Sequence, residues 1–217
     1  HMFRYREFLM ERINSEELSS ASANKDLLHF CGPINFLNEM TDWRLDLPFQ
    51  KLSFKEGQKK QSPTFSPGWI RNEILGAGRL DGLNNQARWI VRIMVNPGAR
   101  PSEIAGTKLS HFDLTAKIPL MYILPEGRQL KNDHSLRSIP LVGLSLEAAR
   151  AAVIDAQRED RDDVFPRYFG KDGISAAVNS FFLDNGLKET DETTLYFIRH
   201  NFEDRLLEAD VPDRERS

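Results

Sequence analysis

Two short basic stretches, Ala99-Arg100-Pro101-Ser102-Glu103 and Leu195-Tyr196-Phe197-Ile198-Arg199-His200, decide the interpretation of this chain. Between them lies a segment of expected strands, in which Arg128-Gln129-Leu130-Lys131 precedes Arg137-Ser138-Ile139-Pro140-Leu141. An arginine presents a rigid fork that matches phosphate oxygens, and a lysine adds a mobile point charge. Two arginines and a lysine gathered from distant points of the chain therefore predict a phosphate clamp and phosphodiester chemistry on DNA.

The order and surroundings of these residues resemble the catalytic domain of the tyrosine recombinases, the phage-integrase family, from about Ser66 to the last residue. In that family a Gly-x-Arg-x-x-Glu motif carries the first catalytic arginine. A β-hairpin carries a lysine ahead of an Arg-x-x-Pro-Leu segment, and a His-x-x-Arg-His motif carries the second arginine. The matching segments here, in the same order, are Gly98 to Glu103, Lys131 with Arg137 to Leu141, and Tyr196 to His200.

The resemblance implies catalytic roles for the charged side chains of these segments. Arg100 and Arg199 would stabilise the negative charge that develops on the nonbridging phosphate oxygens during attack on phosphorus. Lys131 would protonate the departing 5′ oxygen as general acid, and Arg128 is the nearby competitor for that role.

Each of these residues also has a purely structural interpretation. Arg100 could form an ion pair with Glu103 one helical turn along, and Arg199 could form one with Glu203. Lys131 could be an exposed lysine of the hairpin, because lysines are mostly exposed.

Tyr196 stands where most of the family has histidine. A phenol can donate one hydrogen bond to a phosphate oxygen, but its pKa of about 10 denies it the positive charge of an imidazolium. Tyr196 is therefore expected to assist catalysis without being the nucleophile, which in the family lies well beyond the second arginine. Supporting roles are expected for Glu103 beside Arg100, for Asp113 as a partner of the family type, and for His200, which is expected to orient its helix or to pack inside. Glu103 and Asp113 are equally compatible with ordinary surface or capping carboxylates.

The resemblance implies site-specific DNA recombination or integration, in which strands are cut and rejoined through a covalent 3′-phosphotyrosyl intermediate without a metal or cofactor. The expected partners are double-stranded DNA and further copies of the chain in a tetrameric synapse, with no membrane. In the family a later helix carries a third histidine or tryptophan and then the nucleophilic tyrosine, whereas this sequence ends at Ser217. We therefore expect a catalytic domain that is truncated before its nucleophile and inactive alone. The alternative is a non-catalytic DNA-binding homologue of the same fold.

The charge balance argues mildly against nucleic acid, because the net charge is -3 and the isoelectric point is about 6.0. Basic residues nevertheless cluster along the sequence, and the candidate DNA contacts are Lys51, Lys55, Lys59, Lys60, Arg128 and Arg137. Acidic residues collect elsewhere, at 159–163 and 184–192. A basic face with an acidic back is one interpretation of this pattern, and a set of solvated surface runs is the other.

A chain of 217 residues with 40% hydrophobic content can form one sizeable domain and a smaller one. Residues 1–45 are predicted to be the C-terminal remnant of a helical core-binding domain, 46–65 a linker, and 66–217 the integrase-like catalytic domain without its C-terminal end. No apolar run approaches the length of a membrane-spanning helix, and the start lacks a signal-peptide pattern. A cytoplasmic, nucleoid-associated protein of bacterial or phage origin is therefore expected.

The spacing of apolar residues predicts helices over 3–13, 24–40, 66–75, 84–95, 146–156, 174–185 and 194–209. Gly32-Pro33 should break or kink the second of these helices. Arg100 is expected at the entry to a short helix through Ile104. Short β-like runs occupy 109–141, with 118–124 and 138–141 the clearest and Pro125-Glu126-Gly127 as a turn. The predicted fold class is mainly α with a small antiparallel three-stranded β-sheet (α+β), as in a tyrosine-recombinase-like catalytic domain.

Overall fold

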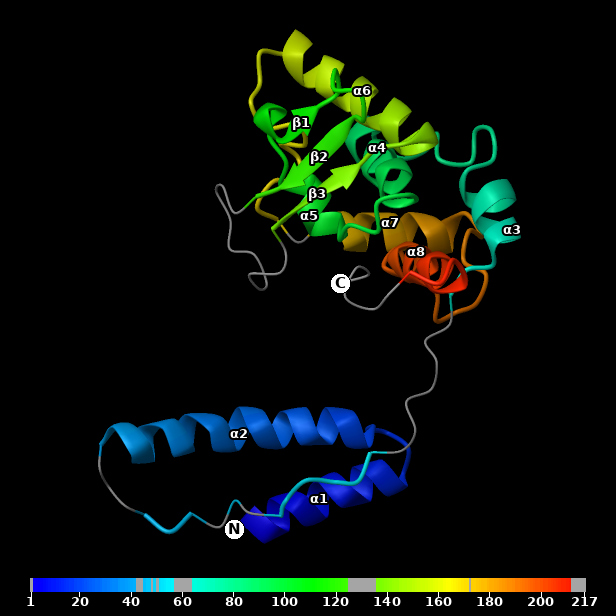
Figure 1. Ribbon diagram of the computed structural model, residues 1–217. Coiled ribbons are helices and arrows are strands. Elements are labelled where there is room, and N and C mark those ends of the chain that lie inside the picture. The colour runs from blue at the N-terminus through cyan, green and yellow to red at the C-terminus, as the bar shows by residue number, and fades with distance from the viewer. Residues whose placement is uncertain are drawn as a thin grey trace. The chain divides into compact units, whose positions relative to one another are not determined.

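The computed structural model describes residues 2–41, 45–47, 49, 51–56, 64–124, 136–171 and 173–211. The chain divides into two compact units, His1–Ser62 and Pro63–Ser217. Figure 1 shows that the first unit is built on a pair of helices, whereas the second combines several helices with a small sheet. Each unit is described by itself.

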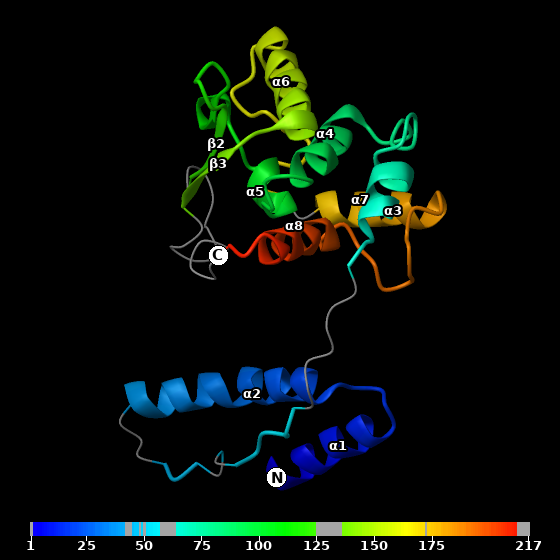
Figure 2. The ribbon, with the colours of Figure 1, turned by 45° about the vertical axis from the view of Figure 1, so that its right-hand side comes forward.

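The first unit is a helical pair with an extended segment packed along it. Helix α1 (Met2–Asn14) lies beside α2 (Ser20–Met40) in both ribbon views (Figures 1 and 2). The buried apolar side chains come from both helices and from the segment that follows them: Met2, Leu9, Ala23, Leu27, Leu52 and Phe54. Part of the predicted linker 46–65 therefore belongs to the core of this unit.

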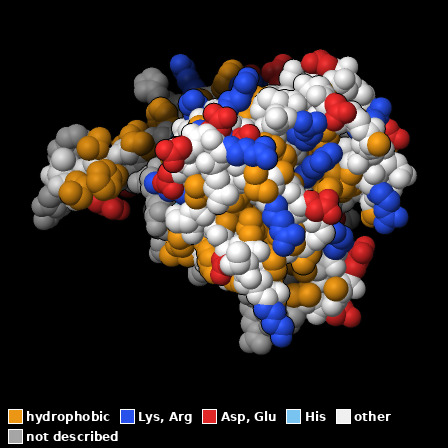
Figure 3. All heavy atoms as spheres, turned by 90° about the horizontal axis from the view of Figure 1, so that it is seen from above, with side chains coloured by type: hydrophobic (Ala, Val, Ile, Leu, Met, Phe, Trp, Pro, Cys, Tyr) orange, Lys and Arg blue, Asp and Glu red, His pale blue; other side chains and the backbone are white. Residues whose placement is uncertain are grey.

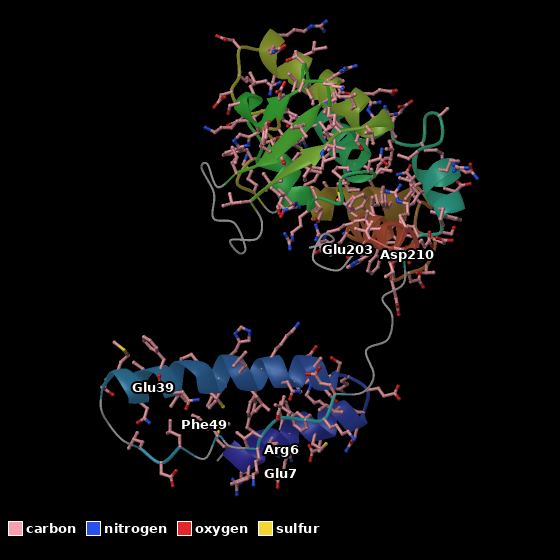
Figure 4. All side chains as sticks on the ribbon, in the orientation of Figure 1. Arg6, Glu7, Glu39, Phe49, Glu203 and Asp210 are labelled. Atoms are coloured by element: carbon pink, nitrogen blue, oxygen red, sulfur yellow. The ribbon has the colours of Figure 1, made fainter. Side chains whose placement is uncertain are left out.

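Asn24 holds that extended segment by pairing with its backbone. The Asn24 side chain donates a hydrogen bond to the Phe54 carbonyl at 3.0 Å and accepts one from the Phe54 N–H at 2.7 Å. Arg6, labelled in Figure 4, donates to the Leu52 carbonyl at 3.0 Å, and its guanidinium lies 4.8 Å from the centre of the Phe54 ring. The Lys, Gln and Ser content of the segment suggested a linker, but two of its apolar side chains, Leu52 and Phe54, are buried against the helices while their neighbours stay exposed.

Helix α2 continues through Pro33, so the expected break at Gly32-Pro33 does not occur. Proline inside a helix removes one backbone hydrogen bond and crowds the carbonyl four residues earlier, here that of His29. Both His29 and Pro33 are exposed, so water can satisfy the carbonyl that lost its partner. The Ser19 hydroxyl caps the start of the helix by accepting from the Ser22 N–H at 3.1 Å.

The second unit contains the remaining elements in the order that the sequence predicts. These are α3 (Pro67–Trp69), η1 (Ile70–Ile74), α4 (Asn85–Met94), α5 (Pro101–Ala105), η2 (Leu109–His111), β1 (Phe112–Asp113), β2 (Leu120–Ile123), β3 (Arg137–Pro140), α6 (Gly143–Arg158), α7 (Gly173–Asp184) and α8 (Phe197–Glu208). The strands form an antiparallel sheet in the order β1-β2-β3. The predicted fold class, mainly helical with one three-stranded antiparallel sheet, is confirmed.

Helix α4 is the centre of the second unit, where it packs against α5, α6 and α7. Its buried side chains, spaced so that they share one broad face, are Ala87, Ile90, Val91, Ile93 and Met94. Full burial of a side chain of the size of isoleucine or methionine contributes about 1.5–3 kcal/mol, so this helix provides much of the unit's stability. Asn84 caps its start by accepting from the Ala87 N–H at 3.1 Å.

The predicted helix start at Ser66-Pro67 is also confirmed. The Ser66 hydroxyl accepts from the Trp69 N–H at 3.2 Å, and Pro67 occupies the first helical position. After Trp69 the chain widens into the π-helix η1, closed by the hydrogen bond from the Leu75 N–H to the Ile70 carbonyl at 2.8 Å. The widening was not foreseen, because the apolar spacing of a π-turn and an α-turn differs by only one residue.

The register of the sheet determines which way β3 directs its side chains. Arg137 pairs with Ile123 and Ile139 pairs with Met121. Alternate residues of a strand share a face, so Arg137 lies on the same face as Ile139, which is buried. The strand therefore carries an arginine to the edge of the core.

Candidate phosphate-binding and catalytic site

Arg100 is positioned by a tight turn that leads into helix α5. Gly98 adopts a φ of +59°, and Arg100 is the N-cap of the helix, with Pro101 at its first position. The Arg100 N–H donates to a Glu103 carboxylate oxygen at 2.8 Å, so Glu103 closes the first turn. The sequence prediction that Arg100 lies at the entry to a short helix through Ile104 is confirmed.

Glu103 joins two arginines that are far apart in the sequence. Its side chain is buried, and its carboxylate oxygens lie 2.5 Å from Arg100 Nη1 and 2.7 Å from Arg137 Nη2. Burial alone raises the pKa of this carboxyl. The hydrogen bonds from Arg137 and Arg100 outweigh burial and hold the pKa below its ordinary value of 4.5. An ionised, buried carboxylate thus fixes the positions of both guanidinium groups.

Tyr196, which lies far from Arg100 in the sequence, interacts with the Arg100 guanidinium. Burial alone lowers the pKa of Arg100, but hydrogen bonds with Glu103 and with Tyr196 outweigh burial and raise it. Tyr196 is the N-cap of helix α8 and is 39% exposed. Its ring meets the His200 ring edge to face, with 5.1 Å between the ring centres. Tyr196 at the start of α8 therefore lies beside Arg100.

Arg199, on the first turn of α8, is the most enclosed of the three arginines. Its side chain is 14% exposed, against 24% for Arg100 and 23% for Arg137. Its Nη1 group donates to the Gly98 carbonyl, and its Nε lies 3.0 Å from a Glu203 oxygen. The second arginine is thus bonded to the turn that precedes the first.

A pocket of about 230 Å³ opens where this turn, strand β3 and helix α8 meet. The residues that line it are Pro97, Gly98, Arg137, Ser138, Ile139, Pro140, Arg199, Phe202, Glu203 and Leu206. Two arginines at the wall of a small hollow can bind the nonbridging oxygens of one phosphate group.

A larger pocket, of about 550 Å³, lies elsewhere on the second unit, between the start of α3 and the later turns of α8. Its walls carry apolar side chains together with charges of both signs, among them Arg205 and Glu208. None of Arg100, Arg137 and Arg199 lines it, whereas Arg137 and Arg199, though not Arg100, line the smaller pocket. The smaller pocket is therefore the better candidate for phosphate chemistry.

The predicted catalytic residues fall into two groups. Arg100, Tyr196 and Arg199 lie in the same region, connected through the Gly98 turn by the contacts just described. Lys131, the predicted general acid, lies outside the described residues. The predicted convergence of all four on one phosphate therefore remains a prediction.

The candidate DNA contacts are spread over both units. Lys51 and Lys55 are exposed residues of the first unit, whereas Lys59, Lys60 and Arg128 lie outside the described residues. Arg137, expected only as a DNA contact, bonds Glu103 beside Arg100. On the face shown in Figure 3, Lys and Arg side chains are interspersed with Asp and Glu, so basic residues are not segregated there.

Both structural alternatives for the arginines are observed, because Arg100 pairs with Glu103 and Arg199 pairs with Glu203. These ion pairs leave donors for a ligand, since a guanidinium has five N–H groups. The Nη2 group of Arg199 has no partner among the residues that the structure describes. Ion pairing and phosphate binding are therefore compatible here.

The supporting residues have different surroundings. Asp113 accepts hydrogen bonds from the N–H groups of Thr115 and Ala116 at 3.3 and 3.1 Å, which is the behaviour of a capping carboxylate in the β1–β2 turn. His200 places Nδ1 3.1 Å from Glu203 and stays on the helix surface, in keeping with an orienting role.

Sequence reasoning missed the contribution of Arg137 and Glu203 to this site. Strand alternation was a usable signal for Arg137, because it shares a strand face with the apolar Ile139. Glu203 was considered only as an ion-pair partner. Its place on the pocket wall depends on how α8 meets β3, which no local pattern reports.

The described residues hold neither a candidate metal site nor a candidate membrane-spanning helix. No group of three or more His, Cys, Asp or Glu side chains in them could hold a metal ion. None of the helices described is both long enough and apolar enough to cross a membrane.

No family model matches the sequence, and no curated protein matches it either. Solved structures do match. The integrase of the Tn1549 transposon (aa 82-397), in complex with circular intermediate DNA, has a TM-score of 0.67 at 15% identity, covering 99% of this chain and 76% of its own. XerH site-specific recombinase, in a post-cleavage complex with palindromic difH substrate, has a TM-score of 0.68 at 15% identity, covering 96% and 62%. XerA recombinase has a TM-score of 0.54 at 17% identity, covering 97% and 69%.

These likenesses span both units of the chain and agree with the order of its motifs. At such low identity they establish the fold and leave the chemistry to the site itself. The chain has the fold of the tyrosine recombinases.

Proposed function

We propose that this chain belongs to an enzyme of site-specific DNA recombination or integration, which cleaves and rejoins strands through a 3′-phosphotyrosyl intermediate. One observation carries the proposal. The two arginine motifs, about a hundred residues apart, meet at the Gly98 turn, where Arg199 donates a hydrogen bond to the Gly98 carbonyl two residues before Arg100. Such a connection between distant cations is what a single phosphate requires.

Each residue has a distinct role in this proposal. Attack on phosphorus increases the negative charge on the nonbridging oxygens, and Arg100 and Arg199 would stabilise that charge from fixed positions. Glu103 holds Arg100 in place and keeps Arg137 beside it. Tyr196 would donate one hydrogen bond to an oxygen, and Lys131 would protonate the departing 5′ oxygen. No metal or cofactor is needed for these steps.

We further propose that the attacking phenol comes from outside these 217 residues. The sequence has four tyrosines, Tyr5, Tyr122, Tyr168 and Tyr196. Tyr5 belongs to the first unit, Tyr168 is buried and Tyr122 lies within β2. Tyr196 contacts Arg100 but stands at the position of an assisting residue. These positions support the proposal that none of the four is the nucleophile.

The first test is covalent capture on a nicked suicide DNA substrate. The 217-residue chain should form no protein–DNA adduct that survives denaturation, because covalent catalysis needs a positioned nucleophile. Denaturing gel electrophoresis with end-labelled DNA measures this. An adduct that disappears in Tyr196→Phe but persists in Tyr122→Phe would identify Tyr196 as the nucleophile and contradict its assisting role.

DNA binding by the chain should be weak and should depend steeply on salt, because the net charge is -3 and affinity must come from a few phosphate contacts. Between about 50 and about 200 mM salt we expect the affinity to fall by at least about tenfold. Titration of labelled duplex by fluorescence anisotropy measures it. Charge reversal at Lys59 and Lys60 should weaken binding further, whereas tight binding that ignores salt would contradict the proposal.

A non-catalytic DNA-binding homologue is the second candidate. Two observations favour it: a phenol replaces the imidazole at Tyr196, and the carboxylate of Glu203 lies directly against Arg199. The two candidates differ in one measurement. A separately supplied segment that carries the nucleophile should restore strand cleavage in the enzyme and should leave the homologue inactive.

The proposed substrate, assembly and location follow from the cleavage and rejoining of DNA strands. Double-stranded DNA is the substrate, and recombination between two duplexes calls for several copies of the chain, which we propose assemble as a tetrameric synapse. The protein would act on the nucleoid or on phage-derived DNA in the bacterial cytoplasm.

A further inference from the structure

Glu203 is an acidic residue on the wall of a pocket whose other charged residues are arginines. Figure 4 labels it on α8. One carboxylate oxygen lies 3.0 Å from Arg199 Nε and the other lies 3.1 Å from His200 Nδ1. Arg137 and Ser138 of strand β3 line the same pocket. The side chain is 37% exposed, so it is accessible from solvent.

The position of this carboxylate matters because it occupies one edge of the guanidinium. Bidentate binding of a phosphate uses two parallel N–H donors of an arginine. Glu203 takes the Nε edge, and the Gly98 carbonyl takes Nη1. A phosphate that approaches Arg199 meets a like charge within a few ångströms, at a site where solvent screening is incomplete.

We propose that Glu203 lowers the affinity of the Arg199 site for phosphate: its carboxylate occupies the Nε edge, so a DNA phosphodiester either displaces it or shares the guanidinium with it. The inference rests on the proposed function and adds a regulatory property to the same site. Displacement does not free Arg199 entirely, since Nη1 keeps its bond to the Gly98 carbonyl. The guanidinium thus stays in place while its partner changes.

Neutralising Glu203 tests this directly. Glu203→Gln keeps the shape of the side chain and removes its charge, so the affinity for labelled duplex DNA should rise by about three- to tenfold. Asp204→Asn is the matched control, because it makes the same charge change one residue later on α8 and away from this pocket. An equal gain in both variants would indicate a general charge effect and would overturn the proposal, as would an unchanged or reduced affinity in Glu203→Gln.

A second variant and a double mutant locate the effect. Glu203→Ala should show the same gain, with the melting temperature checked to establish that the helix stays folded. In an Arg199→Ala background the Glu203→Gln gain should vanish, because the carboxylate acts through that arginine. A gain that persists without Arg199 would contradict the inference.

The same variants distinguish a failure of this inference from a failure of the proposed function. If Arg199→Ala leaves DNA binding unchanged, the proposed phosphate site is wrong. If Arg199→Ala weakens binding and Glu203→Gln has no effect, only the role of Glu203 is wrong. If neither wild type nor variant binds DNA, titration with inorganic phosphate, followed by the NMR signal of Arg199 Nε–H, decides the inference. Saturation of Glu203→Gln at a lower phosphate concentration than wild type supports the inference, and identical titration curves overturn it.

Discussion

Glu103→Ala should destabilise the second unit by about 3 kcal/mol, because it removes the buried carboxylate that pairs with both Arg100 and Arg137. The carboxylate is 5% exposed and accepts from both Arg100 and Arg137. The same substitution removes the capping bond at the start of α5. Urea denaturation followed by tryptophan fluorescence measures the loss, with Trp43→Phe in the background so that Trp69 and Trp89 report the second unit alone.

The matched control is an exposed ion pair with the same short contact. Glu73 lies 2.6 Å from Arg79, and both side chains are about 40% exposed. Glu73→Ala should cost less than about 1 kcal/mol, as exposed pairs do. Equal losses for Glu73→Ala and Glu103→Ala would mean that the buried network adds nothing to stability.

The contribution of Glu103 should also depend on pH in a definite direction. Its pKa in the folded state lies below the ordinary value of 4.5. The stability it adds is therefore complete above about pH 4.5 and is lost as the pH falls through the folded value. The difference in unfolding free energy between wild type and Glu103→Gln should shrink as the pH is lowered from about 7 towards about 3. A difference that grows on acidification would show that the carboxyl is not ionised in the folded protein.

Gly98→Ala should be the most damaging small substitution in the turn before Arg100, at about 2–4 kcal/mol. An added Cβ would lie 2.2 Å from Phe202 Cδ1, and the φ of +59° is itself unfavourable for alanine. The Gly98 carbonyl is also the partner of Arg199, so a shift of this turn moves the second arginine. The unfolding free energy and the affinity for duplex DNA should both fall.

Gly170→Ala separates the cost of the positive φ from the cost of the contact with Phe202. Gly170 has a φ of +63°, but nothing lies within 4 Å of an added Cβ. Gly170→Ala should therefore lower the free energy of unfolding by about 1 kcal/mol, which is the cost of the positive φ alone. If Gly98→Ala costs no more than Gly170→Ala, the contact with Phe202 is not restrictive. A double mutant that adds Phe202→Ala should recover part of the loss through a favourable coupling energy.

Local patterns in the sequence were sufficient for most of the helices and for the turn at Arg100. Asn84 and Ser66 cap helices where a polar side chain precedes an apolar periodicity, and such signals depend only on near neighbours. Pro33 does not end its helix, and the carbonyl that it leaves without a partner, that of His29, is exposed to water. The composition around Leu52 and Phe54 is polar, so it did not reveal that these two side chains pack against α1 and α2.

The motif order proposed Arg100 and Arg199 as site residues, and their ion pairs with Glu103 and Glu203 follow from helical spacing. The contacts between distant parts of the candidate site could not be predicted in the same way. The bond between Arg137 and Glu103 spans 34 residues, and the bond between Arg199 and Gly98 spans 101. Contacts of that range depend on how α8 and β3 meet the turn at Gly98, which is a property of the packed unit.

The small number of buried side chains on α8 has a consequence for ligand binding. Along Phe197–Glu208 only Ile198 and Asn201 are buried, whereas the shorter α4 buries five side chains. A helix with so few buried contacts separates from the core by local unfolding at a lower free energy than the centre of the unit, and its amides exchange hydrogen sooner. A ligand that binds Arg199 together with Arg137 adds its binding free energy to the docked helix. If phosphate binds in this pocket, we expect its occupancy and the docking of α8 to be linked, so that added phosphate slows hydrogen exchange throughout α8.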